Sequence, residues 1–153
     1  MVGPESDVSG LGGIFSKLTD EHGEATRLLA YLLASSNAET RAQLYPALRS
    51  ALLAHEHAEA SVLYAALRQY PSANAIVEEH ARDSDEPRAA VQLLDSLEFA
   101  SESWVSQLNA LFQLLRAHVQ REERDFFPLA LAAIGPTASQ DLREAFCALN
   151  QAS

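Results

Sequence analysis

Apolar residues recur every three or four positions along almost the whole chain, which is the spacing of one face of a helix. The first such stripe comprises Ile14, Phe15, Leu18, His22, Ala25, Leu29 and Leu32. No segment alternates with a period of two residues, so the sequence predicts no strands. Folds that bind nucleotides on a parallel sheet are therefore excluded, and the chain has no glycine-rich phosphate loop.

Breaks in the pattern divide the chain into four long helices and one short one. We expect a first helix that ends at Ser35-Ser36-Asn37, a second over about 39–69, a third over about 73–98, a fourth from about Ser101 to Gly135-Pro136, and a terminal helix over 137–150. Pro87 removes a backbone hydrogen bond from the third helix, so a kink or an interruption is expected there. Long helices joined by short breaks predict an all-α fold, an antiparallel up-down four-helix bundle with a short extra C-terminal helix.

Size and charge restrict the classes of function. The 153 residues fit one domain over 1–153, with the bundle core at about 14–134. Lys and Arg number 11 against 21 Asp and Glu, a net charge of −10, which argues against binding nucleic acid or an anionic membrane. The longest apolar stretch, 28–34, is far shorter than the ~20 residues of a membrane-spanning helix. A single cysteine and an N-terminus without signal-peptide features predict a cytoplasmic protein.

Two segments of the second and fourth helices share one motif. His55-x-x-x-Glu59-x-x-x-Leu63-Tyr64 matches His118-x-x-x-Glu122-x-x-x-Phe126-Phe127. Residues four apart on a helix lie on the same side, one turn apart, so an imidazole and a carboxylate can reach the same point. The first and third helices each supply one histidine after an acidic pair, His22 and His80.

These residues also share a level of the predicted bundle. Their distances along the helices from the breaks near residues 37, 70 and 99 are similar, and each lies on or beside an apolar stripe. Burying the set without a cation would cost several kcal/mol per unpaired group. Nitrogen and oxygen donors of this kind suit two divalent metals, with Fe favoured and Mn or Zn as substitutes. The predicted ligands are His22, His55, Glu59, His80, His118 and Glu122.

On these motifs the chain resembles the hemerythrin family, specifically the HHE cation-binding domains, over about residues 14–134. The resemblance implies a four-helix bundle around a non-haem di-iron centre, with the six residues above as ligands and both glutamates as bridges. Oxygen-carrying hemerythrins have His-x-x-x-His on the third helix, whereas Ile76 and Ser84 flank His80 here. The set of four His and two Glu is closer to members that sense iron or act in cluster repair and in oxidant or nitric-oxide responses.

Three functions follow from the sequence. The first is a di-iron enzyme of the catalase or peroxidase type that turns over H2O2, O2 or NO, with no catalytic residue beyond the metal centre. The second is a non-catalytic module that senses or stores oxygen or iron, and the third is a structural bundle whose buried histidines need no metal. The missing fifth histidine leaves coordination positions open, as catalytic sites require, and favours the first. His57 lies two residues from His55 and is expected to face solvent.

Overall fold

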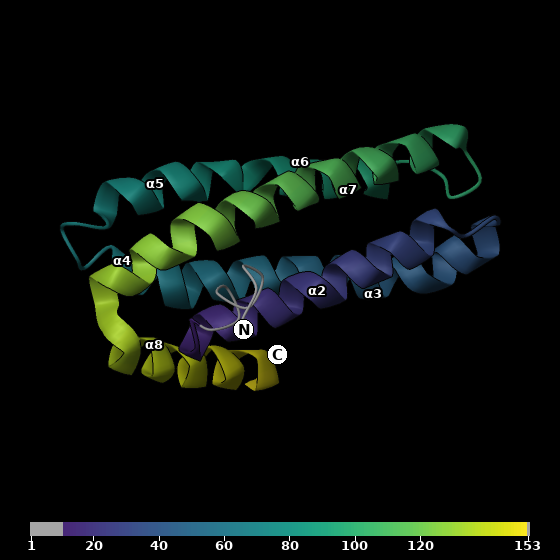
Figure 1. Cartoon of the computed structure of the whole chain (residues 1–153). Coiled ribbons are helices and arrows are strands. Elements are labelled where there is room, and N and C mark those ends of the chain that lie inside the picture. Colours follow the sequence, from purple (N-terminus) through teal and green to yellow (C-terminus); the bar gives the residue numbers. More distant parts are fainter. Residues whose placement is uncertain (1–10, 153) are drawn as a thin grey trace, which may run out of the picture.

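The computed structural model describes residues 11–152, and its side chains as far as residue 150. This part of the chain is helical and contains no strand, so the all-α prediction is confirmed. Figure 1 shows the helices gathered as long rods into a bundle. The rods are α2 (Gly13–Leu33); α3 (Ala38–Ala58), η1 (Glu59–Tyr64) and α4 (Ala65–Leu67); α5 (Asn74–Asp83) and α6 (Asp85–Asp95); and α7 (Glu102–Arg121), η2 (Glu122–Phe126) and α8 (Phe127–Ala152).

Side-chain caps set the beginnings of two rods. The Asn37 side chain accepts a hydrogen bond from the backbone N–H of Thr40 at 2.8 Å, at the start of α3. Ser101 likewise accepts from the backbone N–H of Trp104 at 3.1 Å, at the start of α7. Each cap satisfies a backbone donor that the first turn of a helix leaves free. The breaks expected before residues 39 and 101 therefore have a local physical cause.

The third rod is interrupted at Ser84, between α5 and α6. Pro87 falls in the first turn of α6, where a helix needs no N–H donor and proline is tolerated. An interruption was predicted at Pro87, and the structure has it slightly earlier in the chain. The reason is that the helix restarts before the proline rather than ending at it.

The chain changes direction at Gly135, inside the range of α8. Gly135 has φ +84° and ψ 166°, a conformation that favours glycine and that no helix contains. Figure 1 shows α8 alongside the first part of α2. Arg143 Nη1 donates to the Gly13 carbonyl at 3.2 Å, and a Cβ on Gly13 would lie 2.1 Å from Ser139 Oγ, so the two helices approach closely there.

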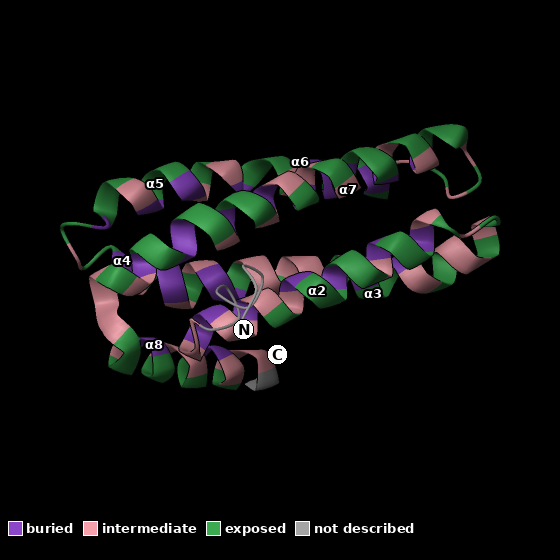
Figure 2. Ribbon diagram, in the orientation of Figure 1, coloured by how far each residue is buried: buried purple, intermediate pink, exposed green. Residues whose placement is uncertain are grey.

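Two apolar clusters fill the interior of the bundle, and Figure 2 shows that the buried stretches of the rods face inward. The first cluster includes Phe15, Leu18, Leu63, Leu67, Val77, Phe127 and Phe146. The second includes Leu29, Leu48, Val91, Trp104, Leu108 and Leu111. Buried polar residues lie between the clusters: His22 follows Leu18 of the first and precedes Leu29 of the second. No helix within the described residues has the length and apolar character needed to cross a membrane.

Candidate metal centre

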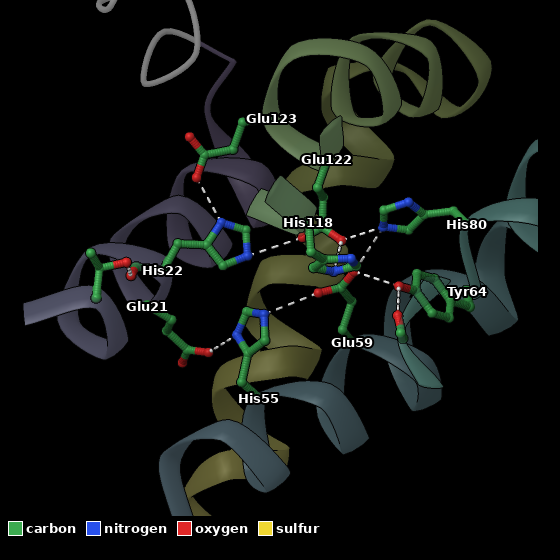
Figure 3. A network of polar contacts seen from close by, with 11 residues as sticks. Glu21, His22, His55, Glu59, Tyr64, His80, His118, Glu122 and Glu123 are labelled. Carbon is green, nitrogen blue, oxygen red and sulfur yellow. Dashed lines mark hydrogen bonds and ion pairs between the residues drawn. The ribbon is translucent and has the colours of Figure 1, made fainter. Parts of the chain in front are cut away.

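All six predicted ligands lie together between the two clusters. Figure 3 shows the four histidines arranged around the carboxylates of Glu59 and Glu122. In each histidine, Nε2 is the ring nitrogen that faces Glu59 or Glu122. Every one of the four rods contributes at least one of these side chains. The six side chains therefore lie at one level of the bundle, as their distances from the helix breaks predicted.

The six side chains form two groups that share Glu122. In the first, His22 Nε2 is 3.0 Å from Glu122 Oε1 and His55 Nε2 is 3.1 Å from Glu59 Oε2. In the second, His80 Nε2 contacts Glu122 Oε2, and His118 Nε2 is 3.3 Å from that same oxygen. Within each group the donor atoms lie no more than 4.8 Å apart, close enough to hold one ion. The two oxygens of Glu122 thus face different groups.

Glu59 also lies between the groups. Its Oε2 faces His55, and its Oε1 is 3.9 Å from His80 Nε2. Tyr64 donates a hydrogen bond from its phenol to Glu59 Oε1 at 2.8 Å, which fixes that carboxylate. The side chains of Glu59 and Glu122 are 3% and 0% exposed. Two buried carboxylates at one point require positive charge nearby.

Both glutamates begin a π-helical turn, which the sequence did not predict. Glu59 opens η1 and Glu122 opens η2. A π turn has i→i+5 hydrogen bonds, so the residue five positions on returns toward the same side. Tyr64, five residues after Glu59, reaches its carboxylate for this reason, whereas in an α-helix it would point well away from it. Single π turns inside α-helices are frequent at functional sites.

The aromatic residues of the repeated motif pack against the histidines. The Phe126 ring stacks on His80 with centroids 4.0 Å apart, and the Phe127 ring stacks on His22 with centroids 6.0 Å apart. His80 also stacks on His118 at 5.0 Å. These contacts explain the hydrophobic-aromatic pair in the motif, because the pair restricts the orientation of the imidazoles.

Two further carboxylates contact the outer nitrogens of the first group. His22 Nδ1 lies 2.6 Å from Glu123 Oε2, and His55 Nδ1 lies 2.7 Å from Glu21 Oε1. A carboxylate can only accept, so each Nδ1 carries the proton and each Nε2 is free to bind a metal. Glu123 follows a predicted ligand in the sequence. Glu21 was missed because it serves a histidine of another helix.

The nitrogen and oxygen atoms that face one another at the centre of the site are suited to bind a cation placed between them. His22 Nε2 and Glu122 Oε1 are buried and, among the described residues, neither has a hydrogen-bond partner. When only Nδ1 is protonated, as metal binding requires, this Nε2 would direct a lone pair at a carboxylate oxygen 3.0 Å away. Two lone pairs repel unless a proton or a metal ion lies between them. The donor set therefore fits a metal centre.

Without metal, protons would supply the positive charge. Burial by itself lowers the pKa of His22, but the carboxylates of Glu122 and Glu123 outweigh burial and raise the pKa to about 9. Burial also lowers the pKa of His55, and Glu21 and Glu59 raise it to about 10. Burial favours a higher pKa for Glu122, yet the surrounding histidines hold that pKa well below its usual range.

Small cavities adjoin the candidate ligands. One of about 220 Å³ is lined by His22, His55 and His118 together with mainly apolar side chains, Leu28 and Leu52 among them. Another of about 40 Å³ lies against His55, Glu59, Tyr64, Ser84 and His118. The second has room for about one small molecule.

The positions that flank His80 hold no nitrogen ligand. Ser84 is buried, and its Oγ lies 3.4 Å from the Tyr64 phenol oxygen. Ile76 lies against the first apolar cluster. His57 is exposed, as its spacing from His55 predicted. The structure thus brings the six predicted ligands together and leaves His57, the remaining histidine of the chain, outside the group.

The family assignment agrees with this geometry. The model of the hemerythrin HHE cation-binding domain matches residues 13–130, a range that holds all six residues. Neither a curated protein nor a solved structure matches the chain. Groups of buried His and Glu able to hold metal ions are what a cation-binding domain requires. The chain belongs to the hemerythrin HHE cation-binding domain family.

Proposed function

We propose that the chain holds two iron ions and uses them to turn over hydrogen peroxide, dioxygen or nitric oxide. The observation that carries this proposal is the position of Glu122, whose Oε1 faces His22 of one group and whose Oε2 faces His80 and His118 of the other. A carboxylate shared in this way is the arrangement by which one side chain bridges two metals. The up-down course of the four helices is part of the proposal, because it is what brings the two halves of the motif to one level.

The number of donors leaves room for a reactant. The first group offers one donor atom from each of four side chains, His22, His55, Glu59 and Glu122, and the second offers one from each of three, His80, His118 and Glu122. Octahedral iron would keep open positions, which catalytic metal sites need. Ser84 occupies one of the two positions from which the third helix could supply another histidine, its Oγ lies 3.4 Å from the Tyr64 phenol oxygen, and the cavity of about 40 Å³ adjoins both residues. A molecule the size of peroxide or a diatomic gas suits this volume.

The remaining residues exclude water and hold the carboxylates. Apolar side chains such as Leu52, Val91 and Leu115 line the small cavity beside the ligands. Tyr64 keeps the proton on its phenol, because burial and the adjacent Glu59 raise its pKa above the ordinary value, and through this O–H it donates a hydrogen bond to Glu59. Iron, when bound, would supply the exchange of electrons with the reactant.

The balanced reaction with peroxide defines the assay. In catalase-type turnover one H2O2 is reduced to two H2O while a second is oxidised to O2, so no other reductant is consumed. Iron-loaded protein is mixed with H2O2 while O2 release and peroxide loss are recorded, and the ferrous protein is mixed separately with O2 and with NO. His57→Ala, an exposed histidine, is the matched control for His118→Ala.

We expect O2 release from the native protein and from His57→Ala, and little from His118→Ala. A reversible O2 spectrum without peroxide turnover would instead favour the non-catalytic sensor or storage module. A protein that stays folded and binds no iron would favour the structural bundle and overturn the proposal.

A further inference from the structure

The two histidine pairs differ in what holds their outer nitrogens. In the His22–His55 pair each Nδ1 contacts a carboxylate, Glu123 at 2.6 Å and Glu21 at 2.7 Å. In the His80–His118 pair, within the described part of the chain, the buried Nδ1 of His118 has no partner. That pair is held by ring stacking, His80 on Phe126 at 4.0 Å and on His118 at 5.0 Å.

This difference acts on metal affinity. A carboxylate that accepts the Nδ1–H fixes the tautomer and orientation of the ring and makes Nε2 a stronger donor. Loss of such a partner typically lowers metal affinity 10–100-fold. Stacking fixes only the plane of a ring and adds no basicity to Nε2. The ions at the two pairs therefore meet donors of unequal strength.

We propose that the metal position at His22 and His55 fills first and binds its ion more tightly than the position at His80 and His118, because Glu21 and Glu123 hold its imidazoles. This inference rests on the proposed function, since it assumes that both positions take a metal. Glu21 and Glu123 are positioning residues in it, because neither Oε atom that holds a histidine lies among the inner donors.

The C-terminal helix contributes to the same position. Asn150 Nδ2 donates to Glu21 Oε2 at 3.2 Å, and Lys17 Nζ lies 3.9 Å from that oxygen. One oxygen of Glu21 is thus held by α8 and α2 while the other holds His55 on α3. Asn150 lies beyond residues 13–130, the range that matches the family. The end of α8 therefore helps to orient a ligand of the tighter position.

The test is a Co²⁺ titration of the metal-free full chain at neutral pH, in competition with a chelator. The native protein is expected to bind in two steps whose dissociation constants differ at least ~10-fold. Glu21→Gln should weaken the first step by roughly 10-fold and leave the second nearly unchanged. Asn150→Ala should weaken the same step by a smaller factor. Glu24→Gln, an exposed carboxylate on the same helix, is the matched control and should change neither.

A second measurement reports the rings themselves. With one equivalent of Co²⁺ the native protein should give paramagnetically shifted, exchangeable Nδ1–H proton resonances from two histidines, protected by Glu21 and Glu123. Glu21→Gln should move or broaden one of them, and His22→Ala should remove the other. If Glu21 acted only in folding, its replacement would not change one of these resonances and leave the other in place. Circular dichroism checks that each variant is folded.

Three outcomes overturn the inference. They are equal affinity at both positions in the native protein, a Glu21→Gln variant that weakens only the second step, and first-equivalent resonances that persist in His22→Ala but vanish in His118→Ala. Failure of the folded native protein to bind any Co²⁺ or Fe²⁺ would overturn the proposed function as well, so the two failures are distinguishable.

Discussion

Replacement of Glu122 by Gln removes a buried charge that both histidine pairs share. The side chain is fully buried, and three Nε2 atoms face it, those of His22, His80 and His118. Gln keeps the shape, but it bridges metals poorly and cannot neutralise protonated imidazoles. Bound metal should therefore fall from two ions per chain to one or fewer.

The metal-free protein should also lose stability. Breaking a buried charge network by removing one partner costs about 3–5 kcal/mol. In a chain of this size each kcal/mol shifts the melting temperature by roughly 2–4 °C, so a decrease of roughly 6–20 °C is expected. The assay combines elemental analysis of dialysed protein with thermal melts followed by circular dichroism, and His57→Gln serves as the exposed control. A Glu122→Gln protein with two bound ions and an unchanged melting temperature would refute this reasoning.

Three more predictions follow from the same contacts. Because the pKa values of His22 and His55 are raised to about 9 and about 10, metal binding at pH 7 should release a proton from each, seen as calorimetric heats that depend on the buffer; heats independent of the buffer would contradict this. Because these pKa values lie above that of a free imidazole, protonation of His22 and His55 stabilises the folded, metal-free protein. This contribution to the free energy of unfolding should be present in full below pH ~6.5 and be lost as the pH rises toward 9–10. Urea unfolding at a series of pH values would measure it, and a flat profile would count against the raised pKa values. Trp104→Ala, a buried change in the second apolar cluster, should cost about 3–5 kcal/mol yet leave the metal content in the cold unchanged, and loss of metal there would mean that the cluster and the site are coupled.

The sequence was sufficient to predict which residues meet at the centre of the bundle. His55 and Glu59, like His118 and Glu122, are one turn apart on a stripe that must be buried, and helices of similar length leave few levels at which such stripes can meet. The caps at Asn37 and Ser101 then fix where the rods begin. Periodicity and local chemistry act within a few residues, so both can be read from sequence.

Features that depend on contacts between helices were not predicted. The π turns at Glu59 and Glu122 alter the helical repeat and so change the direction of Tyr64 and Phe127. The hydrophobic pattern of these segments is the same as that of an α-helix, so the sequence does not indicate the π turns. Glu21 precedes His22 in the chain but holds His55 on the neighbouring helix. Only the approach of α2 to α3 creates that pair.

The C-terminal segment illustrates the same limit. Gly135-Pro136 indicated where the fourth helix must change, since glycine permits the positive φ observed there. The direction taken afterwards depends on Phe146 joining the first apolar cluster and on Arg143 reaching the Gly13 carbonyl. These contacts carry Asn150 to Glu21, and no local pattern in residues 137–150 specifies that end point.

The most direct test of the metal centre is the iron content of the native chain after anaerobic loading with Fe²⁺ and removal of loosely bound ions. Six converging side chains in two groups that share Glu122 predict two iron ions per chain, and Glu122→Gln should reduce that number to one or fewer. A folded native protein that retains no stoichiometric iron would contradict the metal centre. So would a Glu122→Gln variant that retains as much iron as the native protein.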